Sequence, residues 1–451
     1  MNPEVFREYD VRGVVDRDLT PDFAYLLGRA IGTYAFRHGG RKMASGRDCR
    51  LSSKDYQDAV CRGILSSGID VVDIGLAATP MLYFAIRHFE MDGGVMVTGS
   101  HNPSNFNGFK ICIGPETIYG EEIQNLRKMI EEGDFIDGKG SRSCREIEET
   151  YRDHLYANVK VKPGKRIVVD GGNGVGCFFA LPLLQRYGCR VTDIYCEPDG
   201  RFPNHHPDPT IPDNLRELTR LVLEKQADVG IAYDGDADRI GVITDHGEVL
   251  WGDELLLLFS RHILKSNPGA TIIGDVKCSQ KLFDDIAMNG GRAIMWKAGH
   301  SLIKGKLKEE KALLAGEMSG HIFFADRYFG YDDAIYASLR LLEILSESDK
   351  KLSNLLADIP RTFNTPEIRI DCPDRIKVGV VSAVREHYRK NHKMIDIDGV
   401  RVTFDDGWGL LRASNTQPVL VLRFEASTPD RLAQIRMEME SVLDGILKSM
   451  P

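Results

Sequence analysis

Short apolar runs recur along the chain, and each is followed by glycine or polar residues and then by a stretch with helical spacing. A continuous apolar run bounded by turn residues predicts a buried strand, and alternation with helical patterns predicts β–α units. In sheets built from such units, ligands bind beyond the carboxyl ends of the strands. The polar segments that follow four of these runs are therefore the first candidates for chemistry; the runs are 95–97, 167–169, 229–232 and 272–273.

The C-terminal part of the chain has a different pattern. Val419–Ala426 is an apolar run that predicts a strand, and Thr428 followed by Pro429 is a typical start signal of a helix. Apolar residues then recur at helical spacing, which predicts a C-terminal helix packed on a small sheet. These residues are Leu432, Ile435, Met439, Val442, Leu443 and Ile446.

Three stretches are candidate domain boundaries. The first is the charged segment 138–149, the second lies near Gly252 after the hairpin-like segment 240–250, and the third is Pro360–Pro366. These boundaries predict four domains of ordinary size. The predicted domains are residues 1–145, 146–251, 252–362 and 363–451.

Composition and charge narrow the classes of function. The chain has 451 residues and a formal net charge of -8, so a general nucleic-acid binder, which needs a basic footprint, is excluded. A small anionic substrate held by local basic residues is still allowed. No apolar run approaches the roughly 20 residues of a membrane span, and the N-terminus has no secretory pattern. The nine cysteines are scattered without a C-x-x-C pair, which predicts reduced thiols, no zinc site and a cytoplasmic protein.

An acidic loop follows the third apolar run. Asp234, Asp236 and Asp238 stand at alternate positions, and Gly235 permits the tight turn that would bring their carboxylates together. Oxygen ligands of this kind select a hard cation such as Mg²⁺. An EF-hand is disfavoured, because its sixth loop position needs glycine and its twelfth, here Asp245, needs glutamate. A solvated acidic turn is the remaining alternative.

A serine and a histidine follow the first apolar run. Ser100 beside His101 is a candidate nucleophile with an adjacent base. The segment lacks the Gly-x-Ser-x-Gly elbow of the α/β-hydrolases, and an ordinary polar turn is the commoner interpretation of such a pair.

Two later loops carry groups suited to a phosphorylated sugar. Glu317 and Ser319 are flanked by glycines and can bind vicinal hydroxyls, although a glycine turn with a capping glutamate has the same pattern; His321 follows as a ligand contact or a core histidine. The second loop combines an arginine, hydroxyls and backbone N–H groups, which suits a phosphate but also an ordinary loop before a strand. Its candidate residues are Arg412, Ser414, Asn415 and Thr416.

In order and spacing, these four loops resemble the α-D-phosphohexomutase superfamily over essentially the whole chain, and within it the bacterial-type phosphomannomutase/phosphoglucomutase group. The resemblance implies an α/β protein of four domains around a central cleft, with three related α/β domains and a smaller C-terminal α+β domain. It implies that Ser100 carries a phosphoryl group. It implies that Asp234, Asp236 and Asp238 bind Mg²⁺ with a phosphoserine oxygen, that Glu317 and Ser319 contact sugar hydroxyls, and that Arg412, Ser414, Asn415 and Thr416 hold the non-reacting phosphate.

Other segments support the same resemblance. Phe6–Gly13 is similar to the N-terminal signature of the family, in which Tyr9 and Arg12 would face the cleft. Asn107–Lys110 is similar to the segment that carries an active-site lysine, here Lys110. Further substrate contacts are implied for Lys277, Gly299 and His300.

Two features bear on details. Ala237 stands where glycine is frequent in the family, so a positive φ at this position would strain it. Met318 and Asn415 favour unmodified hexose phosphates over glucosamine phosphate, and the Glu317/Ser319 pair is compatible with both mannose and glucose.

The implied reaction interconverts hexose 1-phosphate and hexose 6-phosphate through phospho-Ser100 and a hexose 1,6-bisphosphate, which also primes the enzyme. Lys110, Arg12 and Arg239 would stabilise charge, and Arg239 would alternatively hold the metal carboxylates. His101, His321 and Lys110 are candidate bases. A phosphoglucosamine mutase, a phosphoserine-dependent phosphatase and a non-catalytic sugar-phosphate sensor are the alternatives. We expect a monomer or a small homo-oligomer.

Overall fold

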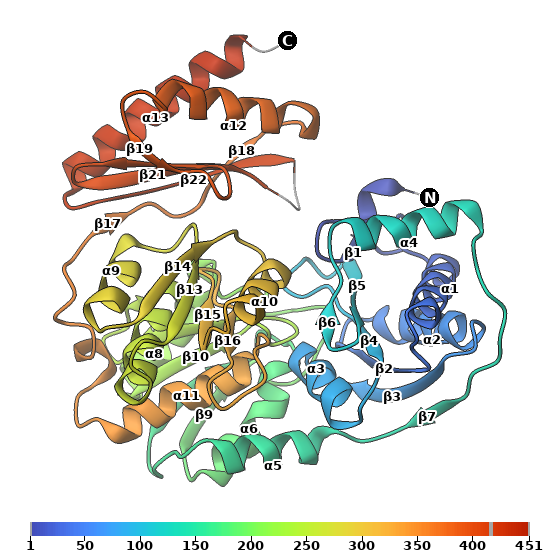
Figure 1. Cartoon of the computed structure of the whole chain (residues 1–451). Helices are drawn as coiled ribbons and strands as arrows, with labels where there is room; N and C mark the ends of the chain where they lie inside the picture. The colour runs from blue at the N-terminus through green and yellow to red at the C-terminus, as the bar shows by residue number, and fades with distance from the viewer. Residues whose placement is uncertain (1, 415–417, 450–451) are drawn as a thin grey trace.

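The computed structural model describes residues 2–414 and 418–449, which form four β-sheets with helices packed against them (Figure 1). All four apolar runs singled out above lie in strands, and Val419–Ala426 is a strand followed by a long helix. The fold class predicted from the resemblance is confirmed. Within the described ranges, none of the helices is both long and apolar enough to cross a membrane.

The first sheet has the order β1-β5-β4-β2-β3-β7, with β6 paired to β5. Its central strands β4, β2 and β3 are parallel to one another. Strand β5 is antiparallel to β4, and β1 is antiparallel to β5. The strands are β1 (Val11–Val14), β2 (Lys42–Arg47), β3 (Asp70–Leu76), β4 (Gly93–Val97), β5 (Phe106–Ile113), β6 (Glu116–Thr117) and β7 (Arg142–Cys144). The helices are η1 (Pro3–Val5), α1 (Pro21–Arg37), α2 (Ser53–Leu65), α3 (Thr79–His88) and α4 (Glu121–Glu132).

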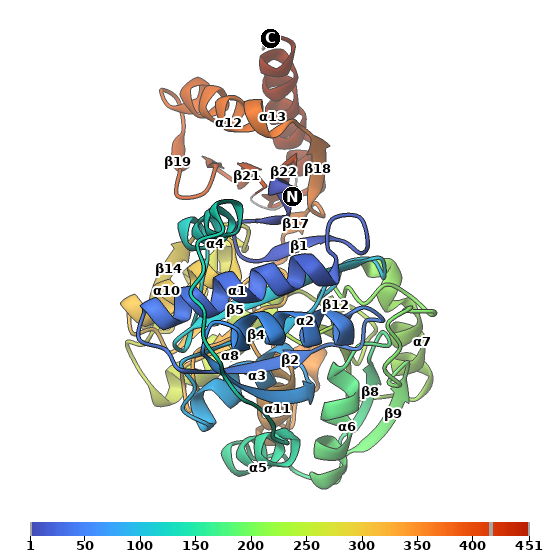
Figure 2. The same ribbon diagram turned by 90° about the vertical axis from the view of Figure 1, so that its right-hand side faces the viewer.

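Close contact between α1 and α2 fixes one face of this sheet (Figure 2). A Cβ atom on Gly28 would lie 2.1 Å from the Val60 carbonyl oxygen, and one on Gly63 would lie 2.2 Å from that of Tyr25. Only glycine fits at these two crossing points. Helix α3 covers the opposite face, where its apolar residues join a different core cluster. The sheet whose strand β4 leads into Ser100 is thereby packed between two helical layers.

The second sheet has the order β12-β11-β10-β8-β9. Strands β9, β8 and β10 are parallel, and β11 and β12 complete an antiparallel hairpin whose turn contains Gly247, as predicted. The strands are β8 (Arg166–Asp170), β9 (Arg190–Ile194), β10 (Val229–Tyr233), β11 (Ile240–Thr244) and β12 (Val249–Leu250). The helices are α5 (Glu148–Asn158), α6 (Gly176–Arg186), η2 (Pro212–Leu215) and α7 (Arg216–Glu224).

The third sheet has the order β14-β13-β15-β16, in which only β16 is antiparallel to its neighbour. The strands are β13 (Thr271–Asp275), β14 (Arg292–Trp296), β15 (Leu314–Gly316) and β16 (Ile322–Phe324). The helices are α8 (Gly252–Ser266), α9 (Gln280–Met288), α10 (His300–Glu309), α11 (Ala334–Glu347) and η3 (Leu352–Asn354).

The fourth sheet is antiparallel, with the order β17-β22-β21-β20-β19 and β18 also paired to β22. Figure 1 shows α12 and α13 on its outer face, away from the other sheets. The strands are β17 (Phe363–Asn364), β18 (Ile368–Asp371), β19 (Lys393–Ile395), β20 (Val400–Phe404), β21 (Gly407–Ala413) and β22 (Val419–Ala426). The helices are α12 (Asp374–Tyr388) and α13 (Pro429–Ser449).

The apolar core of the fourth domain is separate from the core that the first three domains share. One continuous cluster contains residues from the first, second and third domains, from Ala44 to Leu352. The fourth domain has a cluster of its own, from Cys372 to Leu443. Its main polar anchors to the third domain are buried arginines: Arg401 Nη1 donates to the carbonyl of Val276 at 2.8 Å, and Arg423 Nη1 donates to that of Lys277 at 2.8 Å. The first three domains are thus one packed body, and the fourth is docked onto it.

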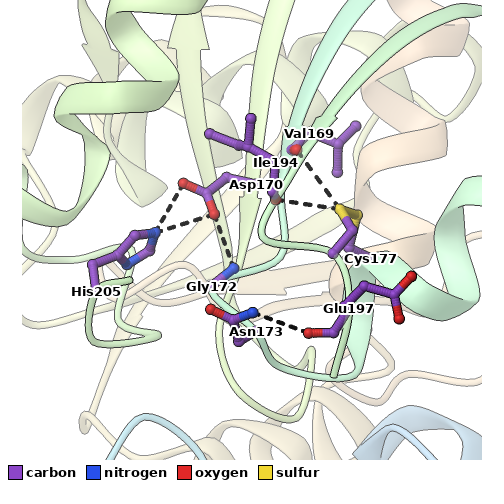
Figure 3. Close-up of a disulfide and its surroundings, with 9 residues drawn as sticks. Val169, Asp170, Gly172, Asn173, Cys177, Ile194, Glu197 and His205 are labelled. Carbon is purple, nitrogen blue, oxygen red and sulfur yellow. Dashed lines mark hydrogen bonds and ion pairs between the residues drawn. A yellow bond between two sulfur atoms is a disulfide. The ribbon is translucent and has the colours of Figure 1, made fainter. Parts of the chain in front are cut away.

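A disulfide corrects the expectation that all thiols are reduced. Cys177, in the first turn of α6, is bonded to Cys196, which follows β9, with Cα atoms 5.1 Å apart (Figure 3). The expectation was wrong because the two cysteines are 19 residues apart in sequence and meet only when β9 pairs with β8. In Figure 3 the bond lies beside the loop of Gly172 and Asn173, which follows β8.

Removing this disulfide should destabilise the protein by about 3 kcal/mol, the size expected from chain entropy for a loop of this length. Urea unfolding of Cys177→Ala/Cys196→Ala should therefore show a lower free energy of unfolding than the parent in the absence of reductant. Cys189→Ala is the matched control, since Cys189 is a partly buried free thiol next to β9. Equal stability of the double variant and the oxidised parent would contradict the prediction.

Candidate active site

Ser100 lies in a tight loop after β4. Its side chain is buried, with 2% of the residue exposed, and its φ of 47° is in the left-handed region. The Oγ donates to Asp234 Oδ2 at 2.9 Å and lies 3.1 Å from His101 Nδ1. A serine in this strained conformation is held there by its surroundings, and it joins the serine loop of the first domain to the acidic loop of the second.

Arg50 holds this loop in place and was missed from the sequence. Its buried guanidinium forms a salt bridge with Asp48, which also accepts the Gly99 N–H at 3.2 Å. A Cβ on Gly99 would lie 2.5 Å from Arg50 Nε, so the loop wraps directly over the guanidinium. The guanidinium donates to four carbonyl oxygens, those of Ser100, Asn102, Pro103 and Phe106. The polar run that follows strand β2 could have indicated Asp48 and Arg50 as candidates from the sequence.

The three aspartates of the acidic loop converge as predicted. They are 0%, 0% and 1% exposed, which excludes the solvated turn, and their ligand atoms lie within 4.8 Å of one another. Asp234 Oδ1 accepts the N–H groups of Asp238 and Arg239, each at 3.1 Å. Thr79 Oγ1, at the start of α3, donates to Asp236 Oδ2 at 2.6 Å. Backbone and hydroxyl donors from two domains thus fix the loop.

Lys110 on β5 partly neutralises these carboxylates. Its Nζ donates to Asp236 Oδ2 at 2.7 Å and also to Asp238 Oδ2. Burial opposes the charge of Lys110, but Asp236 and Asp238 more than offset this and raise its pKa. Burial, with the charges of Asp238 and Asp236, raises the pKa of Asp234 well above its usual range.

Two carboxylate oxygens remain for a cation. Asp236 Oδ1 and Asp238 Oδ1 are buried and have no hydrogen-bond partner in the described part of the chain. Unsatisfied buried oxygens of this kind are costly unless a cation or proton binds them. The carboxylate set therefore fits a hard divalent cation.

The backbone of the acidic loop contacts the serine loop directly. A Cβ on Gly235 would lie 2.4 Å from the Ser100 carbonyl oxygen, so no other residue fits there. Ala237 has a φ of 60°, so the conformation that would strain an alanine is present. A left-handed non-glycine residue costs roughly 1–2 kcal/mol, and the burial and hydrogen bonds of the neighbouring aspartates compensate.

The sugar-binding candidates gather in the third domain. Glu317 follows β15 and is buried, and its Oε1 accepts the Gly299 N–H at 2.6 Å. Gly299 has a φ of 133°, and a Cβ there would lie 2.4 Å from the Tyr9 ring. The Tyr9 hydroxyl donates to the Ala298 carbonyl at 3.0 Å. Ser319 lies two residues after Glu317 and is partly exposed. The structure brings together the candidates of the first and third domains.

The candidate histidines form a second group. The rings of His300 and His321 stack with centroids 5.6 Å apart, and Arg239 Nε donates to His321 Nε2 at 3.0 Å. Asp332 contacts the histidine pair and was missed from the sequence. Burial, together with the charges of Arg239 and Arg12, lowers the pKa of His101 well below its usual range.

Arg12 joins the N-terminal segment to the serine loop. Its Nη1 donates to Asn102 Oδ1 at 2.7 Å, and its Nη2 donates to Asp10 Oδ2 at 2.5 Å. Arg12 therefore lies at the same loop as Ser100.

The fourth domain contributes Arg412 and Ser414, both buried. Arg412 Nε donates to Asp398 Oδ2 at 3.0 Å, and the same oxygen accepts the Ala298 N–H at 3.0 Å. Lys277 Nζ lies 3.3 Å from Glu367 Oε2. Arg412 is thus linked to the loop that carries Gly299 and His300. The candidates Asn415 and Thr416 fall outside the described residues.

Four family models match successive parts of the chain. They are the phosphoglucomutase/phosphomannomutase α/β/α domain I at residues 3–137, domain II at 149–247, domain III at 251–363 and the C-terminal domain at 367–442. The chain belongs to the phosphoglucomutase/phosphomannomutase family. It is thereby a member of the α-D-phosphohexomutase superfamily, as the resemblance predicted.

Individual members of this family match this chain over nearly their whole length. A phosphomannomutase/phosphoglucomutase of Pseudomonas aeruginosa is 46% identical over 448 residues, which cover 99% of this chain and 97% of that protein. A phosphoglucomutase of Neisseria gonorrhoeae is 46% identical over 447 residues, covering 98% and 97%. A crystal structure of a family protein from Burkholderia thailandensis has a TM-score of 0.94 at 39% identity and covers 99% of this chain and 98% of that one.

Proposed function

We propose that this member of the family interconverts hexose 1-phosphate and hexose 6-phosphate, with mannose, glucose or both as the sugar. The observation that carries the proposal is the 2.9 Å hydrogen bond from Ser100 Oγ to Asp234 Oδ2. It joins a buried hydroxyl to a buried cluster of carboxylates on another domain. A nucleophile in contact with a metal-binding carboxylate is what a phosphoryl carrier needs.

We infer that Asp234, Asp236 and Asp238, with an oxygen of phospho-Ser100, hold Mg²⁺. When bound, Mg²⁺ supplies positive charge against the phosphoryl oxygens. Arg239 adjoins the loop in sequence and supplies further charge, and Arg12, which donates to Asn102 of the serine loop, supplies more. The raised pKa of Lys110 supports a role in stabilising charge over a role as the base.

The transfer step follows from the position of Ser100. The free hydroxyl of a hexose 1-phosphate attacks the phosphorus of phospho-Ser100, the P–Oγ bond breaks, and a hexose 1,6-bisphosphate forms. The proton of the sugar hydroxyl passes to His101, since Arg239 Nε already donates to His321 Nε2, and Ser100 Oγ regains a proton and its bond to Asp234. The bisphosphate then turns, and Ser100 takes the other phosphoryl group. Added hexose 1,6-bisphosphate would prime an unphosphorylated enzyme by the same step.

The remaining candidates would position the sugar. Glu317 and Ser319 would bind its hydroxyls, and the loop around Arg412 would hold the phosphate that does not react. The contacts among Tyr9, Gly299 and Glu317 support one continuous binding surface. We assign to this surface Tyr9, Arg12, Lys277, Gly299, His300, Glu317, Ser319, His321, Arg412, Ser414, Asn415 and Thr416.

We propose that the fourth domain moves as a hinged lid about Pro360–Pro366. Its separate apolar core and its docking through buried arginines support a rigid unit that can separate from the rest. We place the domain boundaries after residues 145, 251 and 362. Cytoplasmic localisation and a monomeric or small homo-oligomeric state stay predictions.

Side-by-side assays should identify the sugar. We expect kcat/KM values for mannose 1-phosphate and glucose 1-phosphate to agree within about tenfold, and the value for glucosamine 1-phosphate to be at least about tenfold lower, with Mg²⁺ and a bisphosphate primer present. A pocket contact that must accept two orientations of the C2 hydroxyl discriminates weakly between them. A preference for glucosamine 1-phosphate would assign the chain to the phosphoglucosamine mutases. Steady release of inorganic phosphate in place of hexose 6-phosphate would identify a phosphatase.

A further inference from the structure

Asp332 is a buried carboxylate at the centre of three polar side chains. It is 0% exposed. Its Oδ1 lies 3.2 Å from Lys304 Nζ, and its Oδ2 lies 3.2 Å from His321 Nδ1 and 3.8 Å from His300 Nδ1. None of these contacts was expected from the sequence, because Asp332 lies outside every motif identified there.

The backbone holds Asp332 from both sides. Asp332 forms an isolated β-bridge with Phe323 on β16. The next residue, Asp333, caps α11 by accepting the Tyr336 N–H at 2.8 Å, and it also accepts the hydroxyl of Tyr151. The two neighbouring aspartates therefore have different roles. Asp333 caps helix α11, and Asp332 contacts the histidines.

The hydrogen bond from Arg239 determines the tautomer of His321. A guanidinium can only donate hydrogen bonds, so the 3.0 Å contact from Arg239 Nε makes His321 Nε2 the acceptor. The neutral ring then carries its proton on Nδ1, which lies 3.2 Å from Asp332 Oδ2 and 3.6 Å from Asp238 Oδ1. In the described part of the chain these are charge contacts without hydrogen-bond geometry. The order of groups is carboxylate, imidazole and guanidinium, from Asp332 through His321 to Arg239.

The same order argues against a second metal site here. Asp238, His321 and Asp332 have ligand atoms close enough to hold a cation. His321 Nδ1 would have to offer a lone pair to that cation, but it carries the proton that Arg239 prevents from residing on Nε2. Lys304 already neutralises Asp332 and contacts the Tyr83 hydroxyl at 3.2 Å. Burial disfavours the charged form of Asp332, but Lys304 and His321 more than offset this and hold its pKa well below its usual range.

We propose that Asp332 is a positioning residue that fixes His321 as the Nδ1–H tautomer and, through His321 Nε2, fixes the guanidinium of Arg239 beside the acidic loop. This role rests on the proposed function, in which Arg239 stabilises charge during phosphoryl transfer. Without the negative charge beside Nδ1, the Nε2–H tautomer competes with the contact from Arg239 Nε. Two N–H groups would then face each other, and Arg239 would turn away from the loop.

The test is Asp332→Asn, compared with Asp333→Asn as the adjacent control. We expect Asp332→Asn to lower kcat by about 10²-fold with KM for hexose 1-phosphate changed less than about threefold, because Arg239 acts mainly in the transition state. Asp333→Asn should lower the unfolding midpoint and leave kcat within about threefold. A kcat for Asp332→Asn equal to that of the parent would overturn the proposal.

A second readout is independent of activity. Nitrogen NMR of protein labelled at histidine distinguishes the two tautomers, and the His321 signals are those lost in His321→Gln. We expect Nδ1–H in the parent and in Asp333→Asn, and partial or full Nε2–H in Asp332→Asn. Finding Nε2–H in the parent would overturn the proposal even if Asp332→Asn does not fold. If the parent shows Nδ1–H but no mutase turnover, the proposed function fails while the positioning role stands.

Discussion

Ser100→Ala should reduce the interconversion of hexose 1-phosphate and hexose 6-phosphate by about 10⁴-fold or more, because it removes the only atom that carries the phosphoryl group in the proposed mechanism. Both half-reactions use the same Oγ, so neither direction should survive. Added hexose 1,6-bisphosphate should not rescue the variant, since there is no hydroxyl to prime. Coupled assays in both directions measure the effect.

Ser104→Ala is the matched control. Ser104 lies in the same loop but is exposed, so its hydroxyl has no part in the proposed transfer and its loss should change turnover less than about twofold. Intact-mass analysis should show one phosphoryl group on the parent and on Ser104→Ala after incubation with the bisphosphate, and none on Ser100→Ala. Unchanged turnover in Ser100→Ala would reject the phosphoserine mechanism.

The loss should come from chemistry and not from unfolding. Ser100 Oγ makes hydrogen bonds to Asp234 and to His101, and each such bond contributes about 1 kcal/mol. The loop itself is held through backbone carbonyls by Arg50 and through the Gly99 N–H by Asp48, and neither depends on the serine side chain. Thermal unfolding of the variant should therefore stay close to that of the parent.

Local patterns predicted the strands and the loops well. The apolar runs at 95–97 and 229–232 are buried strands, and the polar segments after them meet, since Ser100 bonds to Asp234 across a domain boundary. The spacing of apolar residues and the presence of turn residues depend only on neighbouring positions, so both can be recognised in the sequence. The rule that ligands collect beyond the carboxyl ends of such strands marked each segment as a candidate, but the meeting of these two segments from different sheets was implied only by the family resemblance.

Residues that act through tertiary contacts were harder to find. Arg50 lies in a polar run after β2 that is visible in the sequence, but the backbone carbonyls that it contacts have no sequence signature. Asp332 contacts histidines that precede it by 11 and 32 positions in the chain, and nothing in its own segment indicates them. The Cys177–Cys196 disulfide depends on the pairing of β8 with β9. In each case the fold determines which residue becomes the partner, and the residue type alone does not identify it.

Removing divalent cations should abolish turnover, and Mg²⁺ should restore it. Lys110 donates to two carboxylate oxygens of the acidic loop, but Asp236 Oδ1 and Asp238 Oδ1 have no hydrogen-bond partner within residues 2–414 and 418–449. Lys110 leaves these two buried oxygens without a partner, so the site should bind a divalent cation strongly. We expect a chelator to lower kcat by about 10³-fold or more, since charge stabilisation is the largest contribution to phosphoryl transfer.

Asp236→Asn and Asp245→Asn separate this site from the EF-hand alternative, in which Asp245 would be the twelfth ligand. Asp236→Asn should lose most of the Mg²⁺-dependent turnover, whereas Asp245→Asn should keep it, because Asp245 instead accepts the Ser353 N–H at 2.9 Å. Binding also has a readout without substrate: Mg²⁺ at 100 times its Kd should stabilise the parent by about 2.7 kcal/mol against unfolding, and it should stabilise Asp236→Asn much less. Full activity in excess chelator, or equal stabilisation of the parent and Asp236→Asn, would show that these carboxylates do not hold the cation. In that case Lys110 would be their permanent partner, and the acidic loop would serve only to position Ser100.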